Sequence, residues 1–130
     1  MPGETNLTTL LKNMTPVLNE GDYVYCIISS IQSIDTAHIL GLFKEMKGFT
    51  IILQREIADR LQLEYSYIAA WITLTIHSSL AATGLTAAFA TALAQEGISC
   101  NVVAAYYHDH IFVAKEDAER AIAVLKRLSL

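Results

Sequence analysis

The chain has 130 residues, of which 53% are hydrophobic, and a formal net charge of −4 at pH 7. This length and composition suffice for one compact body with a hydrophobic core, either a single domain or two small units in close contact, and they exclude a disordered or fibrous chain. Because Lys and Arg are scattered and the net charge is negative, the basic patch of a nucleic-acid-binding protein or of a membrane-surface helix is absent from the sequence.

The N-terminal sequence has no basic segment followed by an apolar one, and no window reaches the ~18 apolar residues of a membrane-spanning helix. The two cysteines, Cys26 and Cys100, each lie in a predicted strand and form no CxxC pair. We therefore expect a cytoplasmic protein with two reduced, buried thiols and no membrane partner.

The first half of the chain predicts a short helix, a strand, an irregular piece, a hairpin and a second short helix. Apolar residues at helical spacing mark the first helix, which Thr15 and Pro16 end, and a β-branched and aromatic run marks the first strand. The hairpin turns at a glycine-containing connection. The elements are a helix over 7–14, a strand over 23–28, hairpin strands over 42–45 and 49–53, and a helix over 55–63, with 29–41 the least regular part.

A long strand over 65–77 joins the two halves, and its alternation places Ile72 on an apolar face and Trp71 on a mixed face. Since strands are typically about 5 to 6 residues long, one this long can serve both halves. After it come a polar loop ending in Gly84, a helix over 85–95, two strands and an amphipathic helix over 115–128. This order, βαββα, supplies five of the six elements of a ferredoxin-like unit.

The segment WITLTIHSSLAATGLTAAFATALAQEGISCNVV, followed by YYHDHIFV and EDAERAIAVLKRL, resembles an ACT domain, a small-molecule-sensing module found beside amino-acid-metabolic enzymes such as aspartate kinases. The first half, with GETNLTTLLKNMTPVLNEGDYVYC and GFTIILQREIAD, is similar to the companion unit of bacterial proteins with two ACT units. The resemblance implies an α+β fold of two tandem βαββαβ units, residues 1–64 and 65–130, each an antiparallel sheet with helices on one face. The chain departs from this pattern because no closing strand follows the last helix and the first half lacks a clear first helix, which leaves the strand order open.

The loop from His77 to Leu85 is the candidate ligand site. Free N–H groups at a helix start attract a carboxylate. The resemblance implies an amino-acid ligand held by the side chains of His77, Ser78 and Ser79 and by the backbone of Gly84, Leu85 and Thr86. In the alternative interpretation, Ser78 and Ser79 only cap a turn and Thr83 caps the helix.

The run from Tyr106 to His110 adds polar candidates. His108, Asp109 and His110 are possible metal ligands that His77 could join, but polar residues at a hairpin tip are usually solvated, so we expect no metal. A ligand-lining or subunit-facing role suits His108, Asp109 and Asn101 better. The alternative for Asn101 is an amide at a sheet edge that bonds to the backbone.

No GxSxG, glycine-rich phosphate loop or HExxH motif occurs, so neither catalysis nor a cofactor is expected. The sequence predicts a regulatory protein that binds a small molecule, with a structural or protein-interaction module as the alternative and an unrecognised enzyme as the third possibility.

The helix over 85–95 is apolar nearly all round, and its outer face of small residues predicts a homodimer or higher homo-oligomer. That face comprises Ala87, Ala90, Thr91 and Ala94.

Overall fold

The computed structural model describes residues 7–75 and 84–129. Packing separates them into two compact units. One unit combines the chain up to Asn19 with the chain from Ala70 onward, and we call it the split unit; the other, Glu20–Ala69, we call the inserted unit. Strand β5 crosses the boundary between the two, because its first two residues belong to the inserted unit and the rest to the split unit.

The sheet of the split unit has the order β1-β5-β7-β6. The short strand β1 lies antiparallel to the end of β5, with Leu18 opposite Ile72, and β6 and β7 form an antiparallel hairpin. Strand β1, from the N-terminal part of the chain, therefore takes the position of the closing strand in this unit. The strands are β1 (Pro16–Leu18), β5 (Ile68–Leu74), β6 (Cys100–Ala104) and β7 (Asp109–Ala114).

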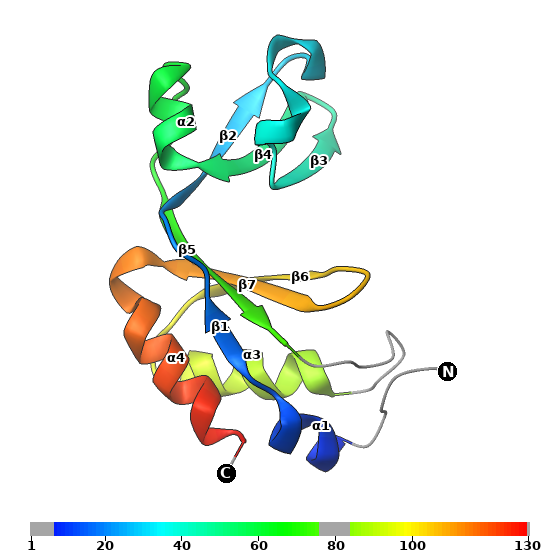
Figure 1. The fold of residues 1–130 in the computed structure, drawn as a ribbon, viewed down its shortest axis with the longest axis vertical. Coiled ribbons are helices and arrows are strands. Elements are labelled where there is room, and N and C mark those ends of the chain that lie inside the picture. The colour runs from blue at the N-terminus through cyan, green and yellow to red at the C-terminus, as the bar shows by residue number, and fades with distance from the viewer. Residues whose placement is uncertain (1–6, 76–83, 130) are drawn as a thin grey trace. The chain divides into compact units, whose positions relative to one another are not determined.

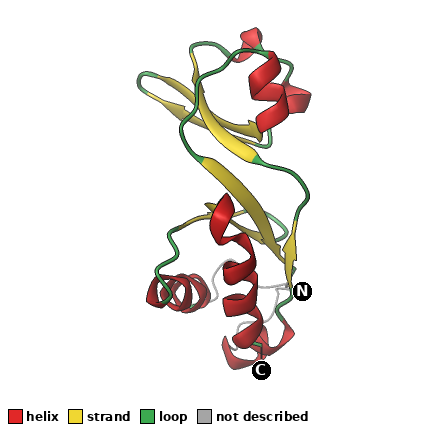
Figure 2. Ribbon diagram, turned by 90° about the vertical axis from the view of Figure 1, so that its left-hand side faces the viewer, coloured by secondary structure: helices red, strands yellow, loops and turns green. Residues whose placement is uncertain are grey.

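The helices of the split unit lie on one side of its strands (Figures 1 and 2). They are α1 (Leu7–Asn13), α3 (Leu85–Gln95) and α4 (Ala118–Arg127), the last preceded by a 3-10 turn, η3 (Lys115–Asp117). Helix α3 buries one stripe, Leu85, Phe89 and Leu93, against the same face of the sheet that carries Ile72 and Ile111. These side chains are nearly inaccessible to solvent, so the helices and the sheet enclose one hydrophobic core.

The inserted unit contributes the strand order β3-β4-β2-β5. Tyr23 in β2 lies opposite Ala69 in β5, so the shared strand also closes this sheet. Two 3-10 turns, capped by the side chains of Ser30 and Asp35, stand where a first helix would follow β2. The elements are β2 (Tyr23–Ile28), η1 (Ile31–Ser33), η2 (Thr36–His38), β3 (Gly41–Glu45), β4 (Gly48–Gln54) and α2 (Arg55–Arg60).

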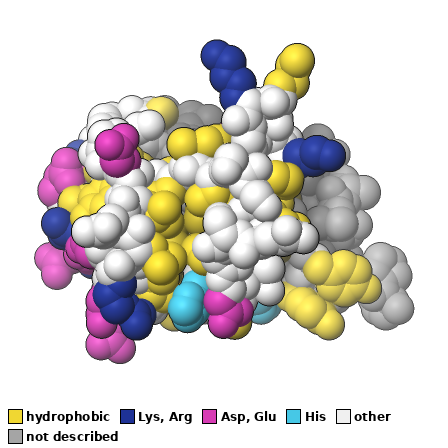
Figure 3. Space-filling model, turned by 90° about the horizontal axis from the view of Figure 1, so that it is seen from above, with side chains coloured by type: hydrophobic (Ala, Val, Ile, Leu, Met, Phe, Trp, Pro, Cys, Tyr) yellow, Lys and Arg dark blue, Asp and Glu magenta, His cyan; other side chains and the backbone are white. Residues whose placement is uncertain are grey.

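The core of the inserted unit is thinner than that of the split unit. It centres on Val24, Ile51 and Leu53, all fully buried, with α2 contributing Ile57 and Ala58. Large apolar side chains stay accessible on this unit, among them Phe43, 72% exposed, and Met46 at the tip of the β3–β4 hairpin. Figure 3 shows the molecule from above. Hydrophobic side chains lie across the middle of this surface among backbone atoms and uncharged polar side chains, and most charged side chains lie towards its margin.

The predicted α+β fold with two ACT-like units and antiparallel pairing is confirmed, whereas the boundary between residues 64 and 65 stays a prediction. Local details add to the sequence expectations. The first helix ends before Thr15 as predicted, and Pro16 also begins strand β1, which the sequence did not indicate. Within the described part of the strand expected over 65–77, regular pairing covers Ile68–Leu74, and His108 lies between β6 and β7, at the expected hairpin tip. Both cysteines are free, with Cys26 buried and Cys100 half-buried.

Candidate functional site

The start of helix α3 provides the backbone of the predicted ligand site. Gly84 occupies the N-cap position with φ of +88°, a left-handed conformation that glycine adopts without strain. Thr83, which the alternative interpretation makes the helix cap, lies outside the described residues, and a glycine offers no capping side chain to the first N–H groups of the helix. Leu85 is buried in the core and Thr86 is exposed. His77, Ser78 and Ser79 lie outside the described residues.

The start of strand β7 provides the polar side chains. His108 closes the β6–β7 turn, where its carbonyl accepts a bond from the N–H of Ala105 at 3.0 Å. The Nδ1 atom of His108 is buried and has no hydrogen-bond partner among the described residues. Asp109 is half-buried and shares the helix-facing side of β7 with Ile111. Burial raises the pKa of Asp109, while the charges of His110 and His108 act in the opposite direction.

The structure places only some of the candidate residues at one end of the sheet. Strands β5 and β7 are neighbours, and Thr73, near the end of β5, contacts His110. The start of β7, with His108 and Asp109, therefore lies at the end of the sheet where β5 leads on towards α3. Asn101 does not, because it pairs with Phe112, three residues along β7 from Asp109 and so on the opposite face, where it is exposed.

A hydrogen-bonded group that the sequence did not indicate lies on the helix-free face of the split unit. The indole Nε1 of Trp71 donates to Nδ1 of His110 at 3.0 Å, which implies the neutral imidazole with its proton on Nε2. Thr73 Oγ1 lies 3.1 Å from the same nitrogen and accepts a bond from Asn19 Nδ2 at 2.9 Å. Burial lowers the pKa of His110, as does the charge of His108, whereas Asp109 raises it.

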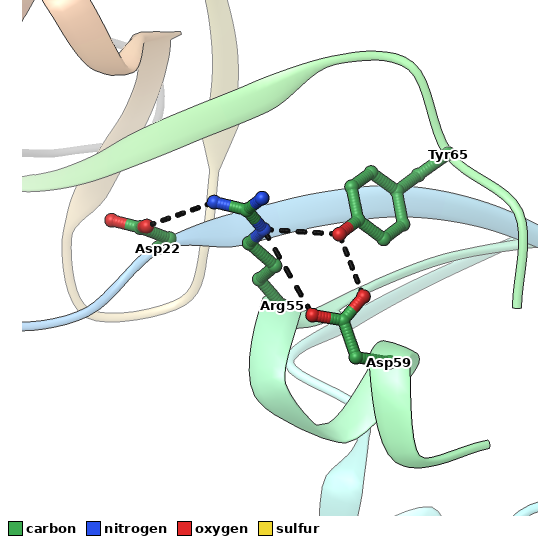
Figure 4. Close-up of polar contacts among 4 residues, drawn as sticks. All are labelled: Asp22, Arg55, Asp59 and Tyr65. Atoms are coloured by element: carbon green, nitrogen blue, oxygen red, sulfur yellow. Dashed lines mark hydrogen bonds and ion pairs between the residues drawn. The ribbon is translucent and has the colours of Figure 1, made fainter. Parts of the chain in front are cut away.

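A charged cluster joins the elements of the inserted unit (Figure 4). Arg55 Nε donates to the hydroxyl of Tyr65 at 3.0 Å, and that hydroxyl donates to Asp59 Oδ1 at 2.7 Å. Ion pairs join Arg55 to Asp22 at 3.7 Å and to Asp59 at 4.0 Å. The hydrogen bond that Arg55 donates to Tyr65 is the main reason that the pKa of Arg55 lies above its ordinary value. No short sequence motif contains this cluster, since its members come from the turn before β2, from α2 and from the segment before β5.

A shallow groove of about 640 Å³ runs past this cluster. Its wall carries four carboxylates and one guanidinium, and the pairs among them are substantially exposed to solvent. Exposed pairs of this kind contribute little to stability. We interpret the cluster as a link between the turn before β2 and helix α2. The groove is lined by Glu20, Gly21, Asp22, Gln54, Arg55, Glu56 and Asp59.

Two family models described as ACT domain match the chain, one over residues 2–70 and the other over residues 66–127. The chain belongs to the ACT domain family. Comparison with curated protein sequences returns no match.

Solved structures show the same ACT architecture. A Vibrio cholerae protein of unknown function, described as a possible transport protein, is 46% identical, with a TM-score of 0.86 over 95% of this chain and 96% of that one. An Agrobacterium tumefaciens protein is 17% identical, with a TM-score of 0.68 over 89% of each chain. The ligand-free regulatory subunit of aspartate kinase from Thermus thermophilus is 12% identical, with a TM-score of 0.65 over 87% of this chain and 95% of that one. The last two likenesses concern the fold alone.

Within the described part of this ACT protein, no three His, Cys, Asp or Glu side chains are grouped so that they could hold a metal ion. Among the same residues, no helix combines the length and the apolar character needed to cross a bilayer.

Proposed function

We propose that this ACT protein is a regulatory module without catalytic activity that binds a free amino acid or a similar small carboxylate. Membership of the family supports a regulatory, ligand-binding role in general. The observation that carries the specific proposal is the glycine N-cap of α3: Gly84 leaves the first N–H groups of an 11-residue helix without a capping side chain of its own. Such a helix start attracts a negatively charged group.

In the proposed complex, the ligand carboxylate lies on the N–H groups of Leu85 and Thr86. Asp109 and His108, at the same end of the sheet, would face the polar remainder of the ligand, and the half-buried carboxylate of Asp109 suits an ammonium group. His77, Ser78 and Ser79 complete the proposed set. Asn101, exposed on the other face of the sheet, is instead a candidate for a subunit-facing role. A ligand changes the behaviour of the protein only through unequal affinity for two of its states.

We further propose a homodimer or higher homo-oligomer in the cytoplasm. The outer face of α3 supports it, because Ala87, Thr91 and Ala94 are exposed and Ala90 is half-buried, so small side chains would let another backbone approach closely. Ala90→Glu should dissociate or aggregate the protein, since the carboxylate would be buried without a partner. A wild-type protein that sediments as a monomer at micromolar concentration would exclude this assembly.

Thermal unfolding with a panel of free amino acids and their biosynthetic relatives tests the ligand proposal. A compound present at about one hundred times its dissociation constant adds about 2.7 kcal/mol to the folded state and raises the melting temperature by several degrees. Gly84→Val should abolish this rise, because the side chain crowds the backbone donors, whereas His77→Ala should change which compound is preferred.

Gly97→Val is the matched control. Gly97 also has a positive φ, +73°, but lies beyond the other end of α3, where an added Cβ meets nothing within 4 Å. Both variants therefore strain a left-handed position, and only Gly84→Val should lose the ligand-induced rise. If millimolar concentrations of the whole panel leave the wild-type melting temperature unchanged, the alternative role as a structural or interaction module is favoured.

A further inference from the structure

Four side chains on the helix-free face of the split unit form a connected group that we call the His110 cluster. Its members are Asn19, Trp71, Thr73 and His110. They come from the segment after β1, from β5 and from β7, so the cluster joins three neighbouring parts of the sheet. Thr73 is buried, and the other three are half-buried.

The cluster requires a neutral imidazole. The indole N–H of Trp71 can only donate, and its nitrogen lies 3.0 Å from Nδ1 of His110, so Nδ1 accepts. Thr73 Oγ1, 3.1 Å from the same nitrogen, can donate its proton there while it accepts the bond from Asn19 Nδ2 at 2.9 Å. A proton on Nδ1 would place two N–H groups against each other at the Trp71 contact, and that hydrogen bond would be lost.

The same residues help to hold the N-terminal segment against the sheet. Strand β1 pairs with β5 over only three residues. Immediately after it, Asn19 binds the carbonyl of Trp71 through its N–H at 2.9 Å and through Nδ2 at 3.2 Å. Val17 and Leu18 are each 41% exposed. Because so short and exposed a strand gains little from burial, its attachment depends in part on the bonds of Asn19 to Trp71 and Thr73.

We propose that the His110 cluster is a pH-dependent switch for residues 16–19. The neutral imidazole holds Trp71 and Thr73 in the positions in which they bind Asn19. Protonation of Nδ1 removes the bond from Trp71 and turns the Thr73 hydroxyl from a donor into an acceptor, so both residues that bind Asn19 must rearrange. Residues 16–19 then separate from β5 more often, which uncovers the edge of β5 over residues 72–74.

Two neighbouring charges act on His110. Burial lowers its pKa most, the charge of His108 lowers it further, and the charge of Asp109 raises it. Separation of residues 16–19 admits water, which moves the pKa back towards its ordinary value of 6.5. The open state therefore takes up a proton first, and opening is favoured as the pH falls below 6.5. The described side chains that face His110 from the other strands carry no titratable group; they are Trp71, Thr73 and Val103.

Nuclear magnetic resonance of the full chain tests the switch. Trp71 is the only tryptophan, so its indole N–H gives a single signal. Between pH 7.5 and pH 5.5 this signal should shift in the wild type. Over the same range the Asn19 amide should open several-fold more often, and at most about tenfold, because opening takes up one proton. Hydrogen exchange, corrected for the intrinsic effect of pH, measures the opening.

His110→Gln separates the switch from other effects of pH. Its side-chain oxygen can accept the bond from Trp71 but takes up no proton in this range, so both pH effects should disappear. His38→Gln, at an exposed position in the inserted unit, is the matched control and should keep both effects. The ratio of opening at the two pH values decides the outcome, so a general loss of protection in the variant does not disturb the test. Equal ratios in His110→Gln and the wild type would overturn the proposal.

The amide of Leu125, fully buried in α4, separates local opening from global unfolding. Asn19 should exchange faster than Leu125 at both pH values, since the proposed opening leaves α4 folded. Equal rates would show that Asn19 opens only when the whole unit unfolds, and a shift of the indole signal without a change at Asn19 would separate the two events. Either result would refute the switch. None of these measurements needs a ligand, so they succeed or fail separately from the ligand proposal.

Discussion

The split unit and the inserted unit build an ACT fold from the chain in different ways. The split unit takes its closing strand from residues that precede the inserted unit, and two helices of 11 and 10 residues help to bury a core of fourteen of the described residues. The inserted unit is continuous in sequence, yet a six-residue helix and two 3-10 turns accompany a core of eight described residues. The comparison shows that continuity along the chain does not determine how well an ACT sheet is covered.

The largest expected effect comes from removing the segment that makes one unit discontinuous. A chain that begins at Glu20 lacks α1 and β1, so the last three residues of β5 lose the partners Pro16, Val17 and Leu18. Since folded domains are stable by only about 5–15 kcal/mol, we expect no cooperative unfolding of the split unit. Circular dichroism during heating measures this. A shortened chain with the cooperative transition of the wild type would show that β1 is dispensable.

A second fragment, residues 1–64, tests whether the inserted unit needs strand β5. Residues 1–64 lack Ile68 and Ala69, the residues of β5 that pair with β2 in the inserted unit. We expect this fragment to unfold without a cooperative transition. If it melted cooperatively, the inserted unit would not need β5.

A buried leucine of the split unit can be compared with an exposed leucine of the inserted unit. Leu93 in α3 is fully buried, whereas Leu61 at the end of α2 is 45% exposed. Leu93→Ala should lower the free energy of unfolding by about 2–5 kcal/mol, because it removes packed methyl groups and leaves a cavity. Leu61→Ala should cost below about 1 kcal/mol, because much of that side chain already contacts water. Urea denaturation measures both, and equal losses would contradict the difference in burial.

Asn19 tests how the N-terminal segment is held to β5. Its Nδ2 donates to the carbonyl of Trp71 at 3.2 Å and to Thr73 Oγ1 at 2.9 Å, and its N–H donates to the same carbonyl at 2.9 Å. Asn19→Ala should cost about 1–2 kcal/mol, since it removes only the side-chain bonds. Asn13→Ala, at an exposed position at the end of α1, should be close to neutral in the same denaturation experiment.

The smallest expected effect is a pH dependence of the split unit at His110. Burial lowers the pKa of His110 in the folded protein below its ordinary value of 6.5, so the unfolded chain takes up a proton first as the pH falls. The stability contributed by neutral His110 is therefore present above pH 6.5 and is lost as the pH falls below that value towards the folded pKa. The raised pKa of Asp109 acts in the opposite sense, since it favours the folded state in acid and loses that contribution as the pH rises.

Denaturation at pH 7.5 and at pH 5.5, in an Asp109→Asn background, isolates the histidine. Stability should decrease towards the lower pH and should change less when His110→Gln is added. His38→Gln, at an exposed position in the inserted unit, is the control and should leave the slope unchanged. If the change in stability with pH were the same in the His110→Gln variant, His110 would not be its cause.

Elements with a strong local pattern could be predicted from the sequence. Helix α3 has the predicted bounds, Leu85–Gln95, because an Ala-rich run without glycine or proline lies between Gly84 and Gly97. Strand β1 could not be predicted: three residues show no alternation, Pro16 argues against a strand, and only the pairing with β5 reveals it. The same reason explains why the contacts of Trp71 with His110, and of Arg55 with Tyr65, were missed, since distant segments bring these residues together. The sequence predicted where α3 begins. Only the register of β6 against β7 shows that Asn101 and Asp109 lie on opposite faces of the sheet.

From the nested pairing of the strands we expect a definite order of folding. Leu18 can meet Ile72 only after the whole inserted unit has been spanned, and closing so long a flexible loop carries an entropic cost. Once Tyr23 has paired with Ala69, the two ends of that loop are already held close together. Only the short connection from Asn19 to Asp22 then remains to be closed. Folding of the inserted unit thus brings β1 close to the end of β5. A mutation that delays folding of the inserted unit should therefore also slow completion of the sheet in the split unit.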